Sequence, residues 1–151
     1  PLALTQAVLP MMTQAGGGRI VVISSIAALY SSPYRSGYNA AKSALHGLFD
    51  ALRAEEHFNK IAVSLIVLGS IRTQVSINAL RANGTTYGRM DPVTASGMDP
   101  AEVARRIVEA TERGCEEITV APLAQRWLVW RKKFFPALGS RAVRLIPKTH
   151  G

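Results

Sequence analysis

The stretch RIVVISS, residues 19–25, is a short run of mainly β-branched apolar residues that ends in two serines. This composition predicts a strand buried on both faces, as the strands of parallel sheets are. The pattern returns in IAVSLIVL at 61–68 and, more briefly, in EITVA at 117–121. Helical segments separate the three runs. Because alternating strands and helices imply right-handed crossovers, the sequence predicts an α/β fold with a parallel sheet.

The helical segments carry start and stop signals of their own. Segment 36–57 places apolar residues at helical spacing, and Ser36 is its predicted N-cap. Another helix begins after Asp99, the predicted N-cap, where Glu102 is expected to complete a capping box. Segment 1–14 is also predicted to be helical and to end at three glycines.

Those glycines, at 16–18, do not form a phosphate-binding loop. Such a loop needs a strand, then glycines, then a helix N-terminus that points at the phosphates. Here the glycines follow a helix and precede a strand, so they are interpreted as a helix stop. Three strands also leave a parallel sheet with a bare edge, which we do not expect in a complete domain.

Composition sets the broad class. With 48% hydrophobic and 19% charged residues, the 151-residue chain is expected to be one soluble globular unit. It has no run of 18 apolar residues that would predict a transmembrane helix, and no signal-peptide pattern follows Pro1. A single cysteine, Cys115, excludes an intramolecular disulfide and favours a reducing compartment.

The net charge of +8 is concentrated in one part of the chain. Residues 1–121 hold 11 Lys and Arg against 10 Asp and Glu, a net charge of +1. Residues 122–151 hold 7 Lys and Arg and no acids, a net charge of +7. This distribution argues against a nucleic-acid groove spread over the fold and favours a local contact with an anionic partner.

A tyrosine and a lysine stand four positions apart in YNAAK, near the start of segment 36–57. This spacing places Tyr38 and Lys42 on one helix face, where an ammonium favours a phenolate and lowers a tyrosine pKa from about 10. Ser25 ends the preceding strand, at the edge where the sites of parallel sheets gather. LGSIRT, residues 68–73, follows the next strand at the same edge. Together these residues predict a general acid/base site with a hydroxyl for a substrate oxygen.

These motifs resemble those of the short-chain dehydrogenases/reductases. The matching residues are IVVISS ending in Ser25, YNAAK with Tyr38 and Lys42, and LGSIRT. Ser25 lies 13 positions before Tyr38, the spacing that this family uses. The resemblance extends over nearly the whole chain and implies the C-terminal half of a doubly wound, Rossmann-like domain. Residues 1–121 are then expected to form a partial catalytic domain of about three parallel strands with flanking helices, and 122–151 a basic amphipathic segment.

The resemblance implies a role for each matched residue. Tyr38 would be the catalytic acid/base beside the coenzyme, and Ser25 the hydroxyl that orients the substrate carbonyl. Lys42 would lower the tyrosine pKa and hold the ribose hydroxyls of a nicotinamide coenzyme. The family usually has proline where this chain has Leu68, so the wall against the nicotinamide and the substrate is expected to differ in shape. Three further residues match positions around the nicotinamide carboxamide and the nearby phosphate: Gly69, Ile71 and Thr73.

The resemblance further implies that a carbonyl and an alcohol are interconverted by hydride transfer between the nicotinamide and the substrate carbon, with NADP(H) expected before NAD(H). The family's glycine-rich coenzyme loop and catalytic asparagine would lie upstream of Pro1, so this chain alone is expected to bind the coenzyme poorly. A catalytically silent or truncated relative, acting as a binding or membrane-surface interaction protein, is the alternative. The presence of Ser25, Tyr38 and Lys42 argues against that alternative.

Residues 74–98 are polar and weakly periodic, and the resemblance implies a mobile lid over the substrate. Residues 76–104, followed by the basic tail, resemble a membrane-associated branch of the family. A lid of this kind suits a hydrophobic substrate of steroid, retinoid or lipid type. Each apolar lid residue either lines the substrate or packs the lid onto the body. The candidate substrate-binding residues are Ser25, Leu68, Val75, Tyr87 and Met90, with Leu80 and Met98 as further candidates.

The basic tail carries an aromatic stripe. A helix from Leu123 would bring four residues onto one face, at offsets of 4, 7 and 11 from the first: Leu123, Trp127, Trp130 and Phe134. Arg126, Arg131 and Lys133 flank this stripe. The pattern favours an interfacial helix with its aromatic rings among lipid headgroups and its cations near anionic lipid. Packing on the body or against a second subunit is the alternative.

Other features have simpler interpretations. His46 and His57 lack acids or cysteines spaced to complete a metal site, so no metal is predicted. NGT at 83–85 is a glycosylation sequon only if this face meets a secretory lumen, and an Asn-Gly turn is the favoured interpretation. We expect a membrane-associated protein of the endoplasmic reticulum, with the cytoplasm as second choice, no nucleic-acid partner, and a homodimer contact through segments 1–14 and 36–57.

Overall fold

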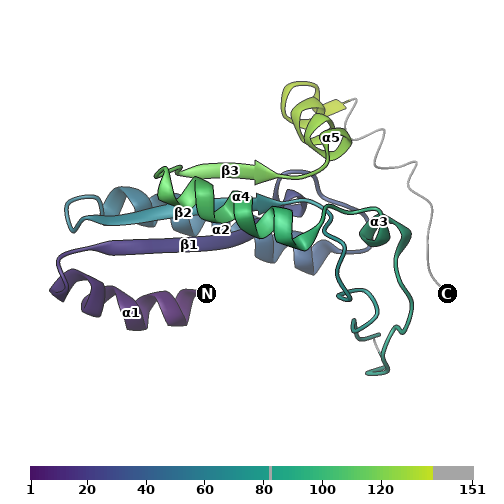
Figure 1. Ribbon diagram of the computed structural model, residues 1–151, viewed down its shortest axis with the longest axis horizontal. Helices are drawn as coiled ribbons and strands as arrows, with labels where there is room; N and C mark the ends of the chain where they lie inside the picture. Colours follow the sequence, from purple (N-terminus) through teal and green to yellow (C-terminus); the bar gives the residue numbers. More distant parts are fainter. Residues whose placement is uncertain (82, 138–151) are drawn as a thin grey trace.

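The computed structural model describes residues 1–81 and 83–137. Its centre is a parallel sheet with the strand order β1-β2-β3, which confirms the predicted α/β fold (Figure 1). The strands are β1 (Gly18–Ser25), β2 (Ile61–Leu68) and β3 (Glu117–Val120). Ser25 pairs in register with Leu68, and Leu68 with Val120, so all three strands end at one carboxyl edge.

Helices precede and connect the strands (Figure 1). In chain order they are α1 (Leu2–Gln14), the 3-10 turn η1 (Ile26–Ala28), α2 (Ser36–Glu55), α3 (Pro92–Ala95), α4 (Pro100–Glu112) and α5 (Leu123–Phe134). Within the two described ranges, none of these helices is long and apolar enough to cross a membrane. The predicted division into 1–121 and 122–151 stays a prediction, and residues 138–151 of that tail lie outside the described residues.

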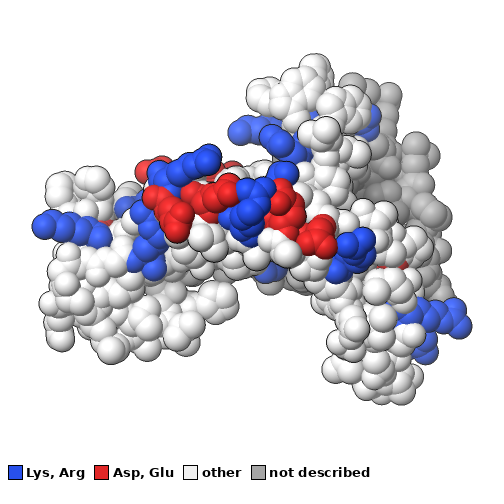
Figure 2. All heavy atoms as spheres, in the orientation of Figure 1, with Lys and Arg blue, Asp and Glu red and all other residues white. Residues whose placement is uncertain are grey.

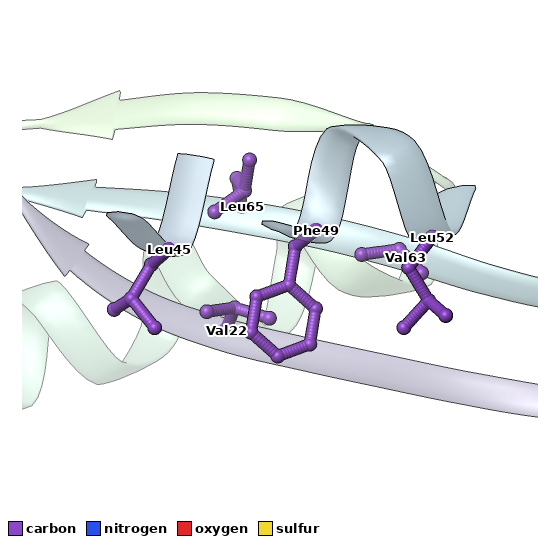
Figure 3. Close-up of a cluster of buried hydrophobic side chains, with 6 residues drawn as sticks. All are labelled: Val22, Leu45, Phe49, Leu52, Val63 and Leu65. Atoms are coloured by element: carbon purple, nitrogen blue, oxygen red, sulfur yellow. The ribbon is translucent and has the colours of Figure 1, made fainter. Parts of the chain in front are cut away.

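The core has two halves because β2 sends successive side chains to opposite faces. Leu65 belongs to a cluster with Phe49 and other side chains of α2, β1 and β2, drawn in Figure 3. The next residue, Ile66, packs on the other face with Val103 of α4 and Val120 of β3. Leu65 and Ile66 are both completely buried. Helices therefore cover both faces of the central strand, as in a doubly wound sheet.

Strand β1 differs from the prediction that it is buried on both faces. Val22 and Ser24 are buried, but Val21 and Ile23 are 37% and 43% exposed. β1 is the edge strand of the described sheet, and α2 packs against only one of its faces. Alternate side chains of β1 therefore point away from α2 and keep part of their surface in solvent.

The helix ends agree with the predictions except at two residues. Ser36 is the first helical residue of α2 and not its cap, a position that Arg35 takes without a side-chain bond. Asp99 does cap α4, accepting from the N–H groups of Ala101 and Glu102. The carboxylate of Glu102, however, bonds to two arginines one turn further along. The arginines draw Glu102 away from the predicted capping box.

The segment between β2 and α4 leaves the body of the fold as an extended excursion (Figure 1). A short antiparallel bridge joins Leu80 and Thr86 within it. Asn83 and Gly84 form the turn between them, with Gly84 at φ 79° and the Asn83 side chain accepting from Thr85. The predicted Asn-Gly turn is therefore confirmed, whereas the assignment of 74–98 as a lid stays a prediction.

Candidate active site

Tyr38 and Lys42 lie one helical turn apart near the start of α2, as their spacing predicts. The Nζ atom of Lys42 donates a hydrogen bond of 3.0 Å to the carbonyl oxygen of Ile23. The same Nζ lies 5.8 Å from the centroid of the Tyr38 ring. The Tyr38 side chain is 47% exposed, so its phenol is accessible from solvent. Lys42 therefore joins the tyrosine to strand β1, two residues before Ser25.

Ser25 stands at the point where β1 passes into η1. Its Oγ accepts a hydrogen bond of 3.2 Å from the amide of Ala27 and so caps η1. Because a hydroxyl can donate while it accepts, the Ser25 hydrogen remains for a further partner. The Ser43 hydroxyl of α2 donates to the carbonyl of Ala28 over 3.1 Å and fixes η1 against the helix that carries Tyr38.

The turn after β2 is held by the start of α5. The Gln125 side chain accepts from the amide of Ser70 over 2.9 Å and donates to the Ser70 hydroxyl over 2.7 Å. A Cβ on Gly69 would lie only 2.5 Å from the Cβ of Ala121 and from Oε1 of Gln125. Glycine is therefore required at position 69 by this close approach, before any contact with a coenzyme is considered.

Within residues 1–81 and 83–137, no backbone hydrogen bond uses the peptide N–H or C=O of Ile71. It forms a parallel bridge with Met98, in which Ser70 and Arg72 exchange the two hydrogen bonds with the Met98 backbone. In such a bridge the N–H and C=O of the central residue point away from the partner. The donor and acceptor of Ile71 thus face away from Met98 and match the pair that an amide needs. Thr73 follows, and its Oγ1 accepts a long bond from Val75.

The candidate substrate residues are not gathered in one pocket. Leu68 and Met98 pack against the α4 half of the core. Val75 and Leu80 are 65% and 73% exposed, and Arg81 stacks over the Tyr87 ring. Met90, 39% exposed, accepts a bond from Ser76 through its sulfur. A groove lies between η1 and α5, and none of the predicted lid residues lines it.

Three side chains near the site, those of Ser24, His46 and Asn39, were not predicted from the sequence to support it. Ser24, 2% exposed, lies within 2.9 Å of Nε2 of His46 and links β1 to α2 directly behind Ser25 and Lys42. His46 follows Lys42 by one helical turn, and that periodicity was the available signal. Asn39, beside Tyr38, donates to the carbonyl of Ser32 over 2.8 Å and secures the approach to α2.

Comparison with known proteins fits this geometry. A model of the family described as short chain dehydrogenase matches residues 1–84, the part that carries Ser25, Tyr38 and Lys42. The chain belongs to the short-chain dehydrogenase family.

Similar curated proteins carry names from one branch of that family. The chain is 42% identical over 143 residues to dehydrogenase/reductase SDR family member 7B of Danio rerio, which covers 95% of this chain and 46% of the relative. It is 41% identical to dehydrogenase/reductase SDR family protein 7-like of Anopheles gambiae, over 91% of this chain and 43% of the relative. The chain thus spans less than half the length of these relatives.

Solved structures show the same fold. A short-chain dehydrogenase from Burkholderia cenocepacia in complex with NADP superposes with a TM-score of 0.74 at 22% identity, covering 97% of this chain and 54% of that one. A short-chain dehydrogenase from Streptomyces avermitilis superposes with a TM-score of 0.69 at 26% identity. The superposition covers 100% of this chain and 59% of the Streptomyces chain. The predicted Rossmann-like architecture is confirmed.

Proposed function

We propose that this chain carries the catalytic residues of an NAD(P)-dependent oxidoreductase that interconverts a carbonyl and an alcohol. The observation that carries the proposal is the position of Lys42. Its ammonium bonds to the Ile23 carbonyl, two residues before Ser25, and lies over the Tyr38 ring. One cation therefore contacts the strand that positions the serine and the helix that positions the tyrosine.

The residues fit a nicotinamide riboside at the carboxyl edge. An ammonium has three donors, and the Ile23 carbonyl takes one of them, so Lys42 retains donors for a sugar diol. The peptide groups of Ile71 that face away from Met98 offer a donor and an acceptor for the carboxamide. When bound, the coenzyme supplies or accepts the hydride. Two of the structural neighbours were solved with NADP and NADPH, which supports the phosphorylated coenzyme.

The chain's own residues handle the proton. In the direction of reduction, the Tyr38 phenol donates its proton to the substrate oxygen as the carbonyl becomes an alcohol. In the direction of oxidation, the phenolate accepts that proton. The nearby Lys42 ammonium stabilises the phenolate by charge. The Ser25 hydroxyl, whose oxygen already accepts from Ala27, donates to the substrate oxygen and orients it.

A hydrophobic substrate is the class that we propose. Leu68 ends β2 beside Ser25, in the register that places both side chains at the carboxyl edge. Val75, Leu80 and Met90 expose apolar side chains on the segment that follows. Burial of these side chains against an apolar substrate would provide binding energy without further polar contacts. Steroids, retinoids and lipid carbonyls all meet this requirement.

The proposal predicts that Lys42→Ala impairs two properties together. In the complete natural polypeptide, NADPH affinity should fall on the order of 10- to 100-fold, because a charged donor to the ribose is lost. Turnover should fall as well, because the phenolate loses its cation. Calorimetry measures the first effect, and nicotinamide absorbance with a panel of hydrophobic ketones and aldehydes measures the second. Lys60→Ala, at the opposite edge of the sheet, is the matched control.

Equal NADPH affinity in the Lys42 and Lys60 variants would contradict the assignment of Lys42. Failure of the unmodified protein to bind either NADPH or NADH would instead favour a silent relative. Coenzyme binding without turnover on any member of the panel would leave the coenzyme site in place and reject the proposed substrate class.

A further inference from the structure

Helix α5 presents an aromatic stripe to solvent. Leu123 is 80% exposed, and Trp127, Trp130 and Phe134 are 54%, 51% and 57% exposed. The residues that hold α5 to the body lie elsewhere on it: Gln125 bonds to Ser70, and Leu128 and Val129 are half-buried. The large apolar side chains of this face are therefore not consumed by packing within the described part of the chain. Exposure of this extent on one helix face marks a contact surface.

Cations border the stripe. The Arg131 guanidinium lies 5.0 Å from the Trp127 ring, and Arg126 and Lys133 are exposed on the same helix. The whole segment 122–151 contains no aspartate or glutamate. In Figure 2 the projecting region that Figure 1 labels α5 shows white and blue spheres, whereas the red spheres are spread over the region of α4. The apolar surface thus meets positive charge.

A groove enlarges the apolar surface. It has a volume of about 1190 Å³ and runs between α5 and the segment that follows Ser25. Ala28 and Leu29 form one wall, Trp127 and Trp130 the other, and Glu117 and Thr119 of β3 also line it. The Trp130 ring packs at 5.3 Å against that of Phe134, so the aromatic wall is continuous.

We propose that α5 is an interfacial helix that docks the protein on an anionic lipid bilayer. The stripe of Leu123, Trp127, Trp130 and Phe134 enters the headgroup region, where amphipathic aromatic rings are stable. The flanking cations contact the lipid phosphates and carboxylates. A two-fold contact with a second copy is disfavoured, because it would place these cations against the same cations of the partner.

Sedimentation with vesicles tests the proposal. The complete natural polypeptide, freed of any separate apolar anchor, is mixed with phosphatidylcholine vesicles that contain either no phosphatidylserine or about 30% of it. Binding should require phosphatidylserine and weaken as salt rises. Arg126→Gln, Arg131→Gln and Lys133→Gln together should lower the partition coefficient by about 100-fold. Trp127→Ala with Trp130→Ala should lower it on the order of 10-fold.

Matched controls separate this surface from general stickiness. Phe58→Ala removes an aromatic side chain that is 90% exposed elsewhere, and it should bind vesicles like the unmodified protein. Arg105→Gln with Arg106→Gln removes two exposed cations from α4 and should also have little effect. Circular dichroism establishes that every variant is folded. Both tryptophans of this chain lie in α5. Their emission is obtained by subtracting the spectrum of the tryptophan variant from that of the unmodified protein. It should shift to the blue on vesicle binding.

Three results would overturn the proposal. In the first, the protein remains in the supernatant at low salt although phosphatidylserine is present, and its tryptophan emission is already shifted to the blue before vesicles are added. That result would place the stripe in an interior contact. In the second, the protein sediments equally with both kinds of vesicle. In the third, it forms a dimer in analytical ultracentrifugation that the tryptophan substitutions dissociate, which would make a second copy the occupant.

Discussion

At the scale of single residues, the hydrogen bond between Ser24 and His46 supports the candidate site from behind. Ser24 precedes Ser25 on β1, and His46 follows Lys42 by one turn of α2. The bond of 2.9 Å is part-buried and joins the two elements that hold the three proposed catalytic residues. It therefore holds α2 against β1 next to the candidate site.

Ser24→Ala should lower the free energy of unfolding by about 1 kcal/mol, because the histidine loses its partner in a part-buried position. A double-mutant cycle with His46→Ala should give a coupling of about 0.5–1.5 kcal/mol. Denaturant unfolding measures both values. Ser36→Ala, at an exposed position of α2, should stay within about 0.5 kcal/mol of the unmodified protein. A coupling energy of zero would show that the bond contributes nothing to the docking of α2.

The local pairs at the site could be predicted, and the long-range ones could not. Tyr38 and Lys42 meet because four residues span one helical turn, a periodicity that the sequence displays. The pair of Ser24 and His46 spans 22 positions, and that of Ser70 and Gln125 spans 55. Those contacts depend on how α2 and α5 settle on the sheet, which no local pattern encodes.

At the scale of elements, α4 depends on a charged cap. Asp99 accepts hydrogen bonds from the amides of Glu102 and Ala101 and pairs with Arg72 over 3.0 Å. These amides, first that of Glu102 and then that of Ala101, with a smaller contribution from Arg72, hold the pKa of Asp99 below its ordinary value. The charged form of Asp99 is therefore favoured by folding.

Asp99→Ala should lower the melting temperature of the complete protein by a few degrees at pH 7. A carboxyl whose pKa is depressed in the folded state stabilises above its unfolded pKa, about 4, and loses that contribution as pH falls through the folded value. The difference between the two proteins should therefore shrink below about pH 4. Thermal unfolding followed by circular dichroism from pH 7 to pH 3 measures it.

Asp50→Ala is the matched control, since the Asp50 side chain is 52% exposed, pairs with Arg53 within α2 and caps nothing. Its effect on the melting temperature should be small, as for other surface ion pairs. A difference for Asp99→Ala that stays constant down to pH 3 would show that the charge of the cap is irrelevant.

Strand β1 shows where prediction of an element from composition ends. A run such as IVVIS is apolar enough for burial on both faces, yet Val21 and Ile23 remain partly exposed. The composition of a strand reports which faces can be buried. Whether they are buried depends on which neighbours lie beside the strand, and in the described sheet β1 has β2 on one side only.

At the scale of the whole molecule, the proposed chemistry and the proposed membrane contact share one edge of the sheet. Ser25, Leu68 and Val120 stand side by side in register, and α5 begins three residues after Val120. Helix α5, the proposed interfacial helix, is thus placed next to the residues that would receive a hydrophobic substrate (Figure 1). This arrangement follows from a parallel sheet, in which every strand ends at the same edge.

The role of Tyr38 as the proton donor is the central claim, and turnover of Tyr38→Phe in the complete polypeptide tests it most directly. The substitution removes one hydroxyl and keeps the ring over which Lys42 lies. Turnover of a hydrophobic ketone with NADPH should fall about 10²- to 10⁴-fold or more, while NADPH affinity stays nearly unchanged. Tyr34→Phe, which removes the hydroxyl of another exposed tyrosine four residues earlier, should retain turnover. Turnover of Tyr38→Phe within a few-fold of the unmodified protein would contradict the assignment.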